Sequence, residues 1–175
     1  IQRLSAQIYW DGVHVQIPSL DFVAPEGSFS GRLAVALGAD SPSYHLLGRV
    51  SDLHWQDALV EADVDVRSSG TGSQLRQQLR AEGQFQAQGL VIDGEALRNA
   101  AGCYDYDARR PAGGELRLRC LEAVVDGDLL SGTGGSSGDG RVTMEISSPR
   151  RTLRLGGAAW PLSIGSSSGP VGQSR

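Results

Sequence analysis

Two short runs place carboxylates at alternate positions, where they could act together. "EADVDV" holds Glu61, Asp63 and Asp65, and "CYDYD" holds Asp105 and Asp107. Two carboxylates on neighbouring elements can serve as acid and base in glycoside hydrolysis. Regular alternation with apolar residues is also what the wet face of any half-buried strand shows. The runs therefore predict a solvated sheet face, with a carboxylate-based hydrolase as the minor alternative.

The remaining candidates for chemistry lack the context that their chemistry needs. His14, His45 and His54 fall on separate expected strands, without the spacing of metal ligands. The glycine-rich run "SGTGGSSGDG" has no following Lys, and "GSFSG" does not have the spacing of a nucleophile elbow. The sequence therefore predicts no catalytic residue, no cofactor and no metal site.

The two cysteines lie in "GCYDYDARRPAGGELRLRC", which has the pattern of a hairpin with its turn centred between residues 111 and 112. A symmetric hairpin places Cys103 opposite Cys120, so we expect a cross-strand disulfide. The same register predicts two stacking pairs: Tyr104 with Arg119 and Tyr106 with Arg117. A disulfide would fit an oxidising compartment such as a bacterial periplasm. Two half-buried free thiols in a cytosolic protein are the alternative.

Composition limits the partners and the location. The 175-residue chain has a formal net charge of −4, and all 16 of its basic residues are Arg, so a nucleic-acid partner is not expected. It has no apolar run of membrane-spanning length and no signal-peptide pattern. Because the sequence opens at Ile1, we interpret it as a piece of a longer or processed protein. An anchor or address could then lie outside it.

Turn residues and alternation predict the fold. Most of the 24 glycines stand at breaks between apolar runs, and Asp-Gly pairs are typical of tight hairpin turns. There are four such pairs: Asp11-Gly12, Asp93-Gly94, Asp126-Gly127 and Asp139-Gly140. They predict an antiparallel meander. We expect one β-rich domain over residues 1–162 and a flexible Gly/Ser-rich tail or linker over 163–175.

The run "LVEADVDVR" is the clearest strand. Val60, Val64 and Val66 face one way and its charged residues the other, which indicates a sheet with one dry and one wet face. The strand "YHLLGRVSDLHW" is expected to bulge at Gly48. "QFQAQGLVI" is expected to bulge at Gly89, with Leu90 or Val91 turned inward.

One short helix is predicted over residues 73–82. Ser73 or Thr71 would cap it, Leu75 and Leu79 stand on one side at i and i+4, and Gly83 would end it. About two turns are marginal alone, so the leucines must dock on an apolar surface. "EALRNAA" is expected to form a second helical turn.

The run "SGTGSQLRQQLRAEGQFQAQGLVIDG" resembles the AsmA-type C-terminal region of bacterial envelope proteins. In that family, a small-residue cap, here Ser69 to Gly72, leads to a short Leu-containing helix, a Gly, a strand and an Asp-Gly turn. The later run "LEAVVDGDLLSGTG" is similar to the segment that follows there. The resemblance is best over residues 58–94 and extends weakly to residue 160.

This resemblance implies a mainly antiparallel curled sheet of the β-taco or β-groove type, with its dry face inside and one side open. It also implies a non-catalytic periplasmic domain, anchored in the inner membrane through the rest of its parent chain. Such proteins are thought to conduct lipids or assist outer-membrane assembly, so lipid acyl chains and envelope proteins are the expected partners. The candidate groove residues are Leu33, Val35, Leu37, Val60, Val64, Val66, Leu116 and Leu118.

An alternating sheet can also close on itself as a sandwich that binds no lipid. The chain would then be a periplasmic or extracellular interaction module for a protein or glycan, using Trp10, Trp55 or Tyr44. The two interpretations differ in whether the dry face is open or sealed.

Overall fold

The computed structural model describes residues 2–38, 40–55, 57–92, 94–110, 114–136 and 141–159, with side chains up to residue 156. The predicted tail (163–175), the predicted turn centre at residues 111 and 112, and the Asp residues of the turns at 93 and 139 lie outside these ranges.

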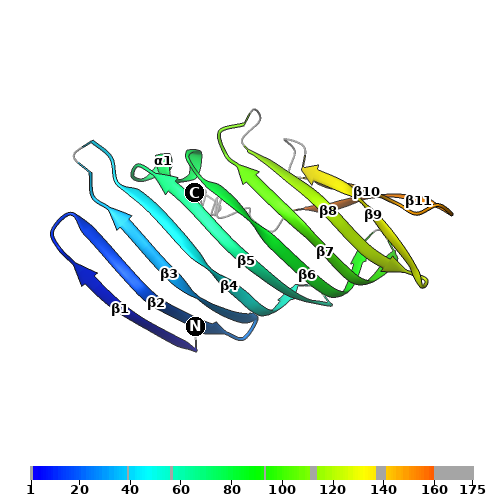
Figure 1. The fold of residues 1–175 in the computed structure, drawn as a ribbon, viewed down its shortest axis with the longest axis horizontal. Helices are drawn as coiled ribbons and strands as arrows, with labels where there is room; N and C mark the ends of the chain where they lie inside the picture. The colour runs from blue at the N-terminus through cyan, green and yellow to red at the C-terminus, as the bar shows by residue number, and fades with distance from the viewer. Residues whose placement is uncertain are drawn as a thin grey trace, which may run out of the picture.

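Eleven strands form a single antiparallel sheet in which each strand pairs with its neighbours in sequence (Figure 1). The strands are β1 (Arg3–Trp10), β2 (His14–Ala24), β3 (Gly27–Ala36), β4 (Ser43–Trp55), β5 (Ala58–Ser69), β6 (Arg80–Ile92), β7 (Glu95–Asp107), β8 (Glu115–Val125), β9 (Asp128–Ser136), β10 (Arg141–Ser147) and β11 (Thr152–Ala159), with α1 (Ser73–Gln77) after β5. Gly12 and Gly127 have φ of 97° and 87° at the turns β1–β2 and β8–β9, as Asp-Gly hairpin turns require. The predicted mainly β, antiparallel, curled fold is confirmed.

The sheet has an apolar face and a polar face, because successive side chains point to opposite sides. In the middle of the sheet, Leu33 pairs with Leu46, and Leu46 pairs with Val66. Val60 pairs with Ala87, which pairs with Ala100. Because apolar residues pair with apolar residues on the neighbouring strands, the apolar face is continuous from strand to strand.

Among the residues that the structure describes, the apolar face is covered at one end of the sheet only. β11 contacts β6 although four strands separate them in the sheet, so the C-terminal strands curl over the apolar face (Figure 1). The largest fully buried side chains in the described part of the chain all lie there: Leu97, Leu116, Val125 and Leu130. We call β6–β11 the closed half and β1–β5 the open half.

The predicted helix is shorter than expected. α1 ends at Gln77, β6 begins at Arg80, and Gly83 lies within β6. Gly72 occupies the N-cap and no side chain caps the helix, so the predicted caps are wrong. Pairing of Arg80 with Arg67 draws the residues after α1 into the sheet. Strand pairing overrides helix propensity here.

"EALRNAA" begins β7 and is not helical. Leu97 and Ala100 are both buried, and this i, i+3 spacing imitates a helix. Their partners on β6 are Leu90 and Ala87, and between these partners Gly89 has a φ of 74°. The bulge expected at Gly89 is not present, because the register of β6 with β7 does not shift there. The positive φ of Gly89 nevertheless accompanies a break in the alternation of both strands, and Leu90 is buried as expected.

The irregularity of β4 is not at Gly48. The register shifts between Val50 and Leu53, where Asp52 has a φ of 55°. Gly48 instead makes room for an aromatic ring, because a Cβ built there would lie 2.5 Å from Cζ of Phe29.

Cys103 and Cys120 form the predicted disulfide, with 5.7 Å between their Cα atoms. The predicted register is wrong between the disulfide and the turn. Cys120 has a φ of 45° and sits at a shift in register, so Cys103 pairs with Arg119. The expected Tyr–Arg pairs are replaced by apolar pairs: Tyr104 with Leu118 and Tyr106 with Leu116.

Candidate apolar trough

The candidate site is the apolar face of the open half. One row of paired side chains crosses all five strands: Leu4 with Phe22, Phe22 with Phe29, Phe29 with Val50, and Val50 with Ala62. Ile8 and Trp10 lie on the same face of β1, and their exposed fractions are 65% and 72%. Contiguous exposed apolar residues often mark a binding surface.

The eight predicted groove residues divide into three groups. Leu33, Val35, Val60, Val64 and Val66 lie on the apolar face of the open half and are half-buried. Leu37 follows the end of β3 and is exposed. Leu116 and Leu118, with exposed fractions of 1% and 6%, belong to the core of the closed half and cannot line an open trough.

Sequence reasoning named Trp10, Tyr44 and Trp55 only for an interaction module, and it missed two aromatic residues of this face, Phe22 and Phe29. Phe22 and Phe29 form a direct cross-strand pair. Tyr44 and Trp55 lie half-buried on the same face, and Trp55 packs against the core of the closed half. The signal that could have found Phe22 and Phe29 is the short turn after Ala24, since its register places them opposite each other.

The open half is long enough for an acyl chain. Five strands spaced about 4.8 Å apart span about 19 Å, whereas one leaflet of a bilayer has a hydrocarbon depth of about 15 Å. The closed half has no comparable space, because Leu130 at its centre is 0% exposed. An acyl chain could therefore lie across β1–β5 and end against the closed half.

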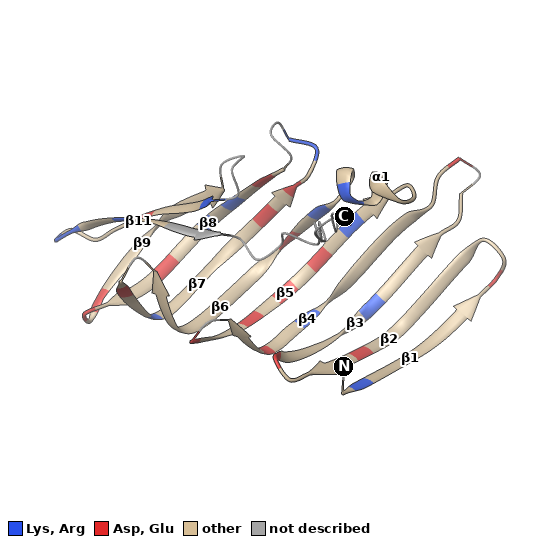
Figure 2. Ribbon diagram, turned by 180° about the vertical axis from the view of Figure 1, so that it is seen from behind, with Lys and Arg blue, Asp and Glu red and all other residues tan. Residues whose placement is uncertain are grey.

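Acidic and basic residues lie along the middle strands of the sheet (Figure 2), and several of those on the polar face form ion pairs. On the open half, the Arg49 guanidinium lies 2.6 Å from Glu61 and 3.4 Å from Asp63. Asp65 is contacted by His45 at 2.9 Å and by Arg67 at 3.0 Å.

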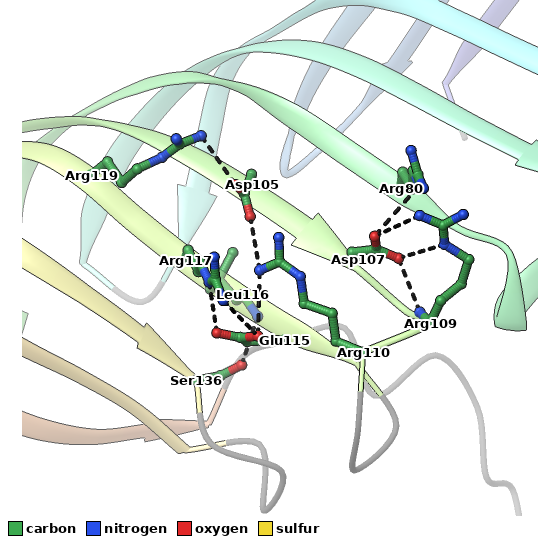
Figure 3. Close-up of polar contacts among 10 residues, drawn as sticks. All are labelled: Arg80, Asp105, Asp107, Arg109, Arg110, Glu115, Leu116, Arg117, Arg119 and Ser136. Atoms are coloured by element: carbon green, nitrogen blue, oxygen red, sulfur yellow. Dashed lines mark hydrogen bonds and ion pairs between the residues drawn. The ribbon is translucent and has the colours of Figure 1, made fainter.

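The carboxylates of the closed half are paired in the same way (Figure 3). Asp107 lies 2.9 Å from Arg109 and 3.5 Å from Arg80. Asp105 lies 3.0 Å from Arg119 and 3.5 Å from Arg110. Each of these two carboxylates therefore has two Arg partners, whereas a glycosidase needs one carboxyl group without such partners as its general acid.

Glu115 also has Arg partners on the polar face. A hydrogen bond donated by Arg117 at 2.7 Å, with the nearby charge of Arg110, lowers the pKa of Glu115 below its ordinary value. A lowered pKa is the opposite of what a general acid needs.

Two hollows open on the polar face. One, of about 230 Å³, lies between β4 and β8 and is lined by Arg49, Glu61, Gln84, Gln86 and the disulfide. The other, of about 190 Å³, is lined by the ion pairs around Asp65, Arg80 and Asp107. Apart from Glu82, the charged residues that line them form ion pairs within the protein, so neither hollow resembles a site for a charged ligand.

Tyr104 joins the two halves. Its side chain reaches from β7 across β6 to β5, where its hydroxyl donates a hydrogen bond of 3.0 Å to the carbonyl of Asp63. Gly83 permits this crossing, since a Cβ there would lie 2.9 Å from the hydroxyl. Burial, and then the negative charges of Asp63 and Asp65, raise the pKa of the Tyr104 phenol from 10.0 to about 12.

The three histidines have separate surroundings. His14 contacts Asp11 at 3.1 Å, His45 contacts Asp65, and the ring of His54 lies 3.1 Å from the carbonyl of Asp52. Among the residues that the structure describes, no cluster of His, Cys, Asp and Glu could hold a metal ion.

No known family model, curated protein or solved structure matches the chain. Within the described ranges, no helix is long and apolar enough to cross a membrane.

Proposed function

We propose that this chain is a lipid-binding β-groove domain of a periplasmic envelope protein of the AsmA type, which holds acyl chains in the trough formed by β1–β5. One observation supports the proposal: among the described residues, the sheet presents a continuous apolar face that is sealed over β6–β11 and uncovered over most of β1–β5. Acyl chains need such a surface and no specific chemistry, because hydrophobic attraction is not directional. The domain acts as a conduit for lipids or a scaffold in outer-membrane assembly, without catalysis.

The disulfide supports the proposed location. Structural disulfides persist in oxidising compartments, and the bacterial periplasm is one of them. Anchoring in the inner membrane would be provided by parts of the parent chain outside this sequence.

The alternative of an interaction module finds less support in the arrangement of the aromatic residues. It requires an exposed aromatic patch, but Tyr44 and Trp55 are half-buried on the apolar face. Trp10 alone of the three is exposed.

Native mass spectrometry of protein prepared without detergent tests the proposal. Wild-type protein is expected to carry co-purified lipid or to bind added fatty acid. Val64→Asp places a charge in the trough and is expected to reduce bound lipid strongly, because burying an unpaired charge under an acyl chain is costly. Asp63→Asn, on the opposite face of β5, is the matched control and should bind as wild type.

Circular dichroism and thermal melting of both variants show whether they remain folded. Wild-type protein that is folded and never binds lipid or fatty acid would overturn the proposed function.

A further inference from the structure

The disulfide lies on the polar face of the closed half, where solvent reaches it. Cys120 is exposed and Cys103 is half-buried. Both residues line the hollow of about 230 Å³ that opens between β4 and β8. Disulfides that only stabilise a fold are usually resistant to thiols, whereas exposed or strained ones exchange readily. The position of this bond therefore gives an external thiol a direct route to it.

The backbone of Cys120 is strained. Its φ of 45° lies in the left-handed region, which residues other than Gly rarely adopt. This conformation occurs at the register shift that brings Arg119, instead of Cys120, opposite Cys103. Because opening the bond would free Cys120 to leave this conformation, the strain favours exchange.

Backbone pairing holds β7 and β8 together on both sides of the disulfide. Ala100 pairs with Ala123 on one side, and Tyr104 pairs with Leu118 on the other. Leu118 and Ala123 are also buried in the core of the closed half. The bond can therefore open while the two strands stay paired, so exchange does not require the protein to unfold.

We propose that the Cys103–Cys120 disulfide is a reversible thiol–disulfide exchange site, whose substrate is a dithiol reductant. A thiolate of the reductant attacks the sulfur of Cys120, the more exposed cysteine. A mixed disulfide forms, the bond to Cys103 breaks, and Cys103 leaves as a thiolate that takes up a proton from water. The second thiolate of the reductant then attacks the mixed disulfide and releases Cys120. Two electrons pass to the protein, which ends with two thiols, and the reductant ends as a disulfide.

The hollow places a neutral hydrogen-bond donor beside the sulfur that leaves. Gln84 pairs directly with Cys103 and lines the same hollow. The Cβ atoms of directly paired residues lie about 5 Å apart, so the Gln84 amide is within reach of the Cys103 thiolate and can donate a hydrogen bond to it. Exchange at this site does not depend on lipid binding, because the hollow and the trough lie on opposite faces of the sheet.

Reduction of the folded wild-type protein by dithiothreitol, a small dithiol, tests the site. Maleimide mass tagging counts the thiols, and circular dichroism shows whether the sheet is intact. Two thiols per chain are expected to appear without loss of β structure, at a rate that is the same with and without urea below the unfolding transition. If only opened molecules react, urea raises the rate. A rate that increases with urea would overturn the proposal.

Reduced glutathione, an anionic thiol, tests whether attack occurs through the hollow. Gln84→Glu adds a negative charge beside Cys103 and is expected to slow the reaction about threefold at low salt, because like charges repel. Gln88→Glu adds the same charge on the same face of β6, opposite Asn99 and outside the hollow, and should react as wild type. Equal rates for the two variants would overturn attack at this site.

Discussion

The open and closed halves of the sheet have the same alternation of apolar and polar residues, but their apolar side chains differ in burial. In the closed half, β11 reaches β6 and seals side chains such as Leu97 and Leu130. In the open half, residues of the same kind, such as Leu4 and Ile8, remain more than half exposed. Alternation therefore produces an apolar face, and contacts between distant strands decide whether that face becomes a core or a trough.

The largest effect is expected from removing a core side chain of the closed half. Leu130→Ala should lower the free energy of unfolding by about 4 kcal/mol, because Leu130 is fully buried and leaves a cavity. Leu33→Ala, in the open half, should cost about 1 kcal/mol or less, since part of that side chain already contacts solvent. Urea unfolding of both variants measures the difference. Equal losses would mean that the two halves are packed alike.

Removing the disulfide tests how the closed half is held. The bond joins β7 to β8 across 17 positions of sequence. A disulfide that closes a loop of this size raises the free energy of unfolding by about 3 kcal/mol. The double substitution Cys103→Ala with Cys120→Ala should lower the urea midpoint accordingly, and a reducing agent should then have no further effect. Stability unchanged by the substitutions would show that strand pairing alone holds these strands.

Tyr104→Phe tests the junction between the halves. Loss of the hydrogen bond to Asp63 should cost about 1 kcal/mol at neutral pH. The pKa of Tyr104 is raised in the folded state to about 12. The protonated phenol therefore contributes its full stabilisation of the folded state below the ordinary pKa of 10.0, and this stabilisation is lost as the pH rises through about 12. Chemical denaturation between pH 9 and about 12 should show wild type losing stability faster than Tyr104→Phe. Parallel profiles would contradict this role.

The smallest effect is expected at the β1–β2 turn. Hydrogen bonds from the backbone of His14 and Val13, and from the His14 side chain, lower the pKa of Asp11 from 3.8 to about 2. The stability from this carboxylate is present above pH 3.8 and is lost as pH falls through about 2. Asp11→Ala should remove that acid dependence with little change in the overall midpoint, because Asp11 is exposed. An NMR titration giving Asp11 an ordinary pKa would contradict the turn geometry.

Much of the fold could be predicted from local patterns. The Asp-Gly turns and the run from Val60 to Val66 indicate hairpins and two faces because these signals are local. The shift at Cys120 could not be predicted, since a positive φ in a residue other than Gly is set by its surroundings. The short extent of α1 also depends on the pairing of β5 with β6. Helix propensity is a local property of the sequence and does not predict this pairing.

The candidate site could be predicted only in part. Val60, Val64 and Val66 were found because they alternate with charged residues. Leu116 and Leu118 alternate in the same way, but the curl of the C-terminal strands seals them. Whether a given stretch of the face is open depends on the contact of β11 with β6, far apart in sequence, and alternation carries no information about it.

Thiol labelling tests most directly whether the apolar face of the open half is accessible and binds acyl chains. Leu33→Cys and Leu118→Cys place one new thiol on the apolar face of each half. In the folded protein, the thiol at position 33 is expected to react quickly with a maleimide and to be protected by added fatty acid, while the thiol at position 118 stays unreactive throughout. Slow labelling at position 33, or labelling that fatty acid does not change, would contradict an open lipid trough.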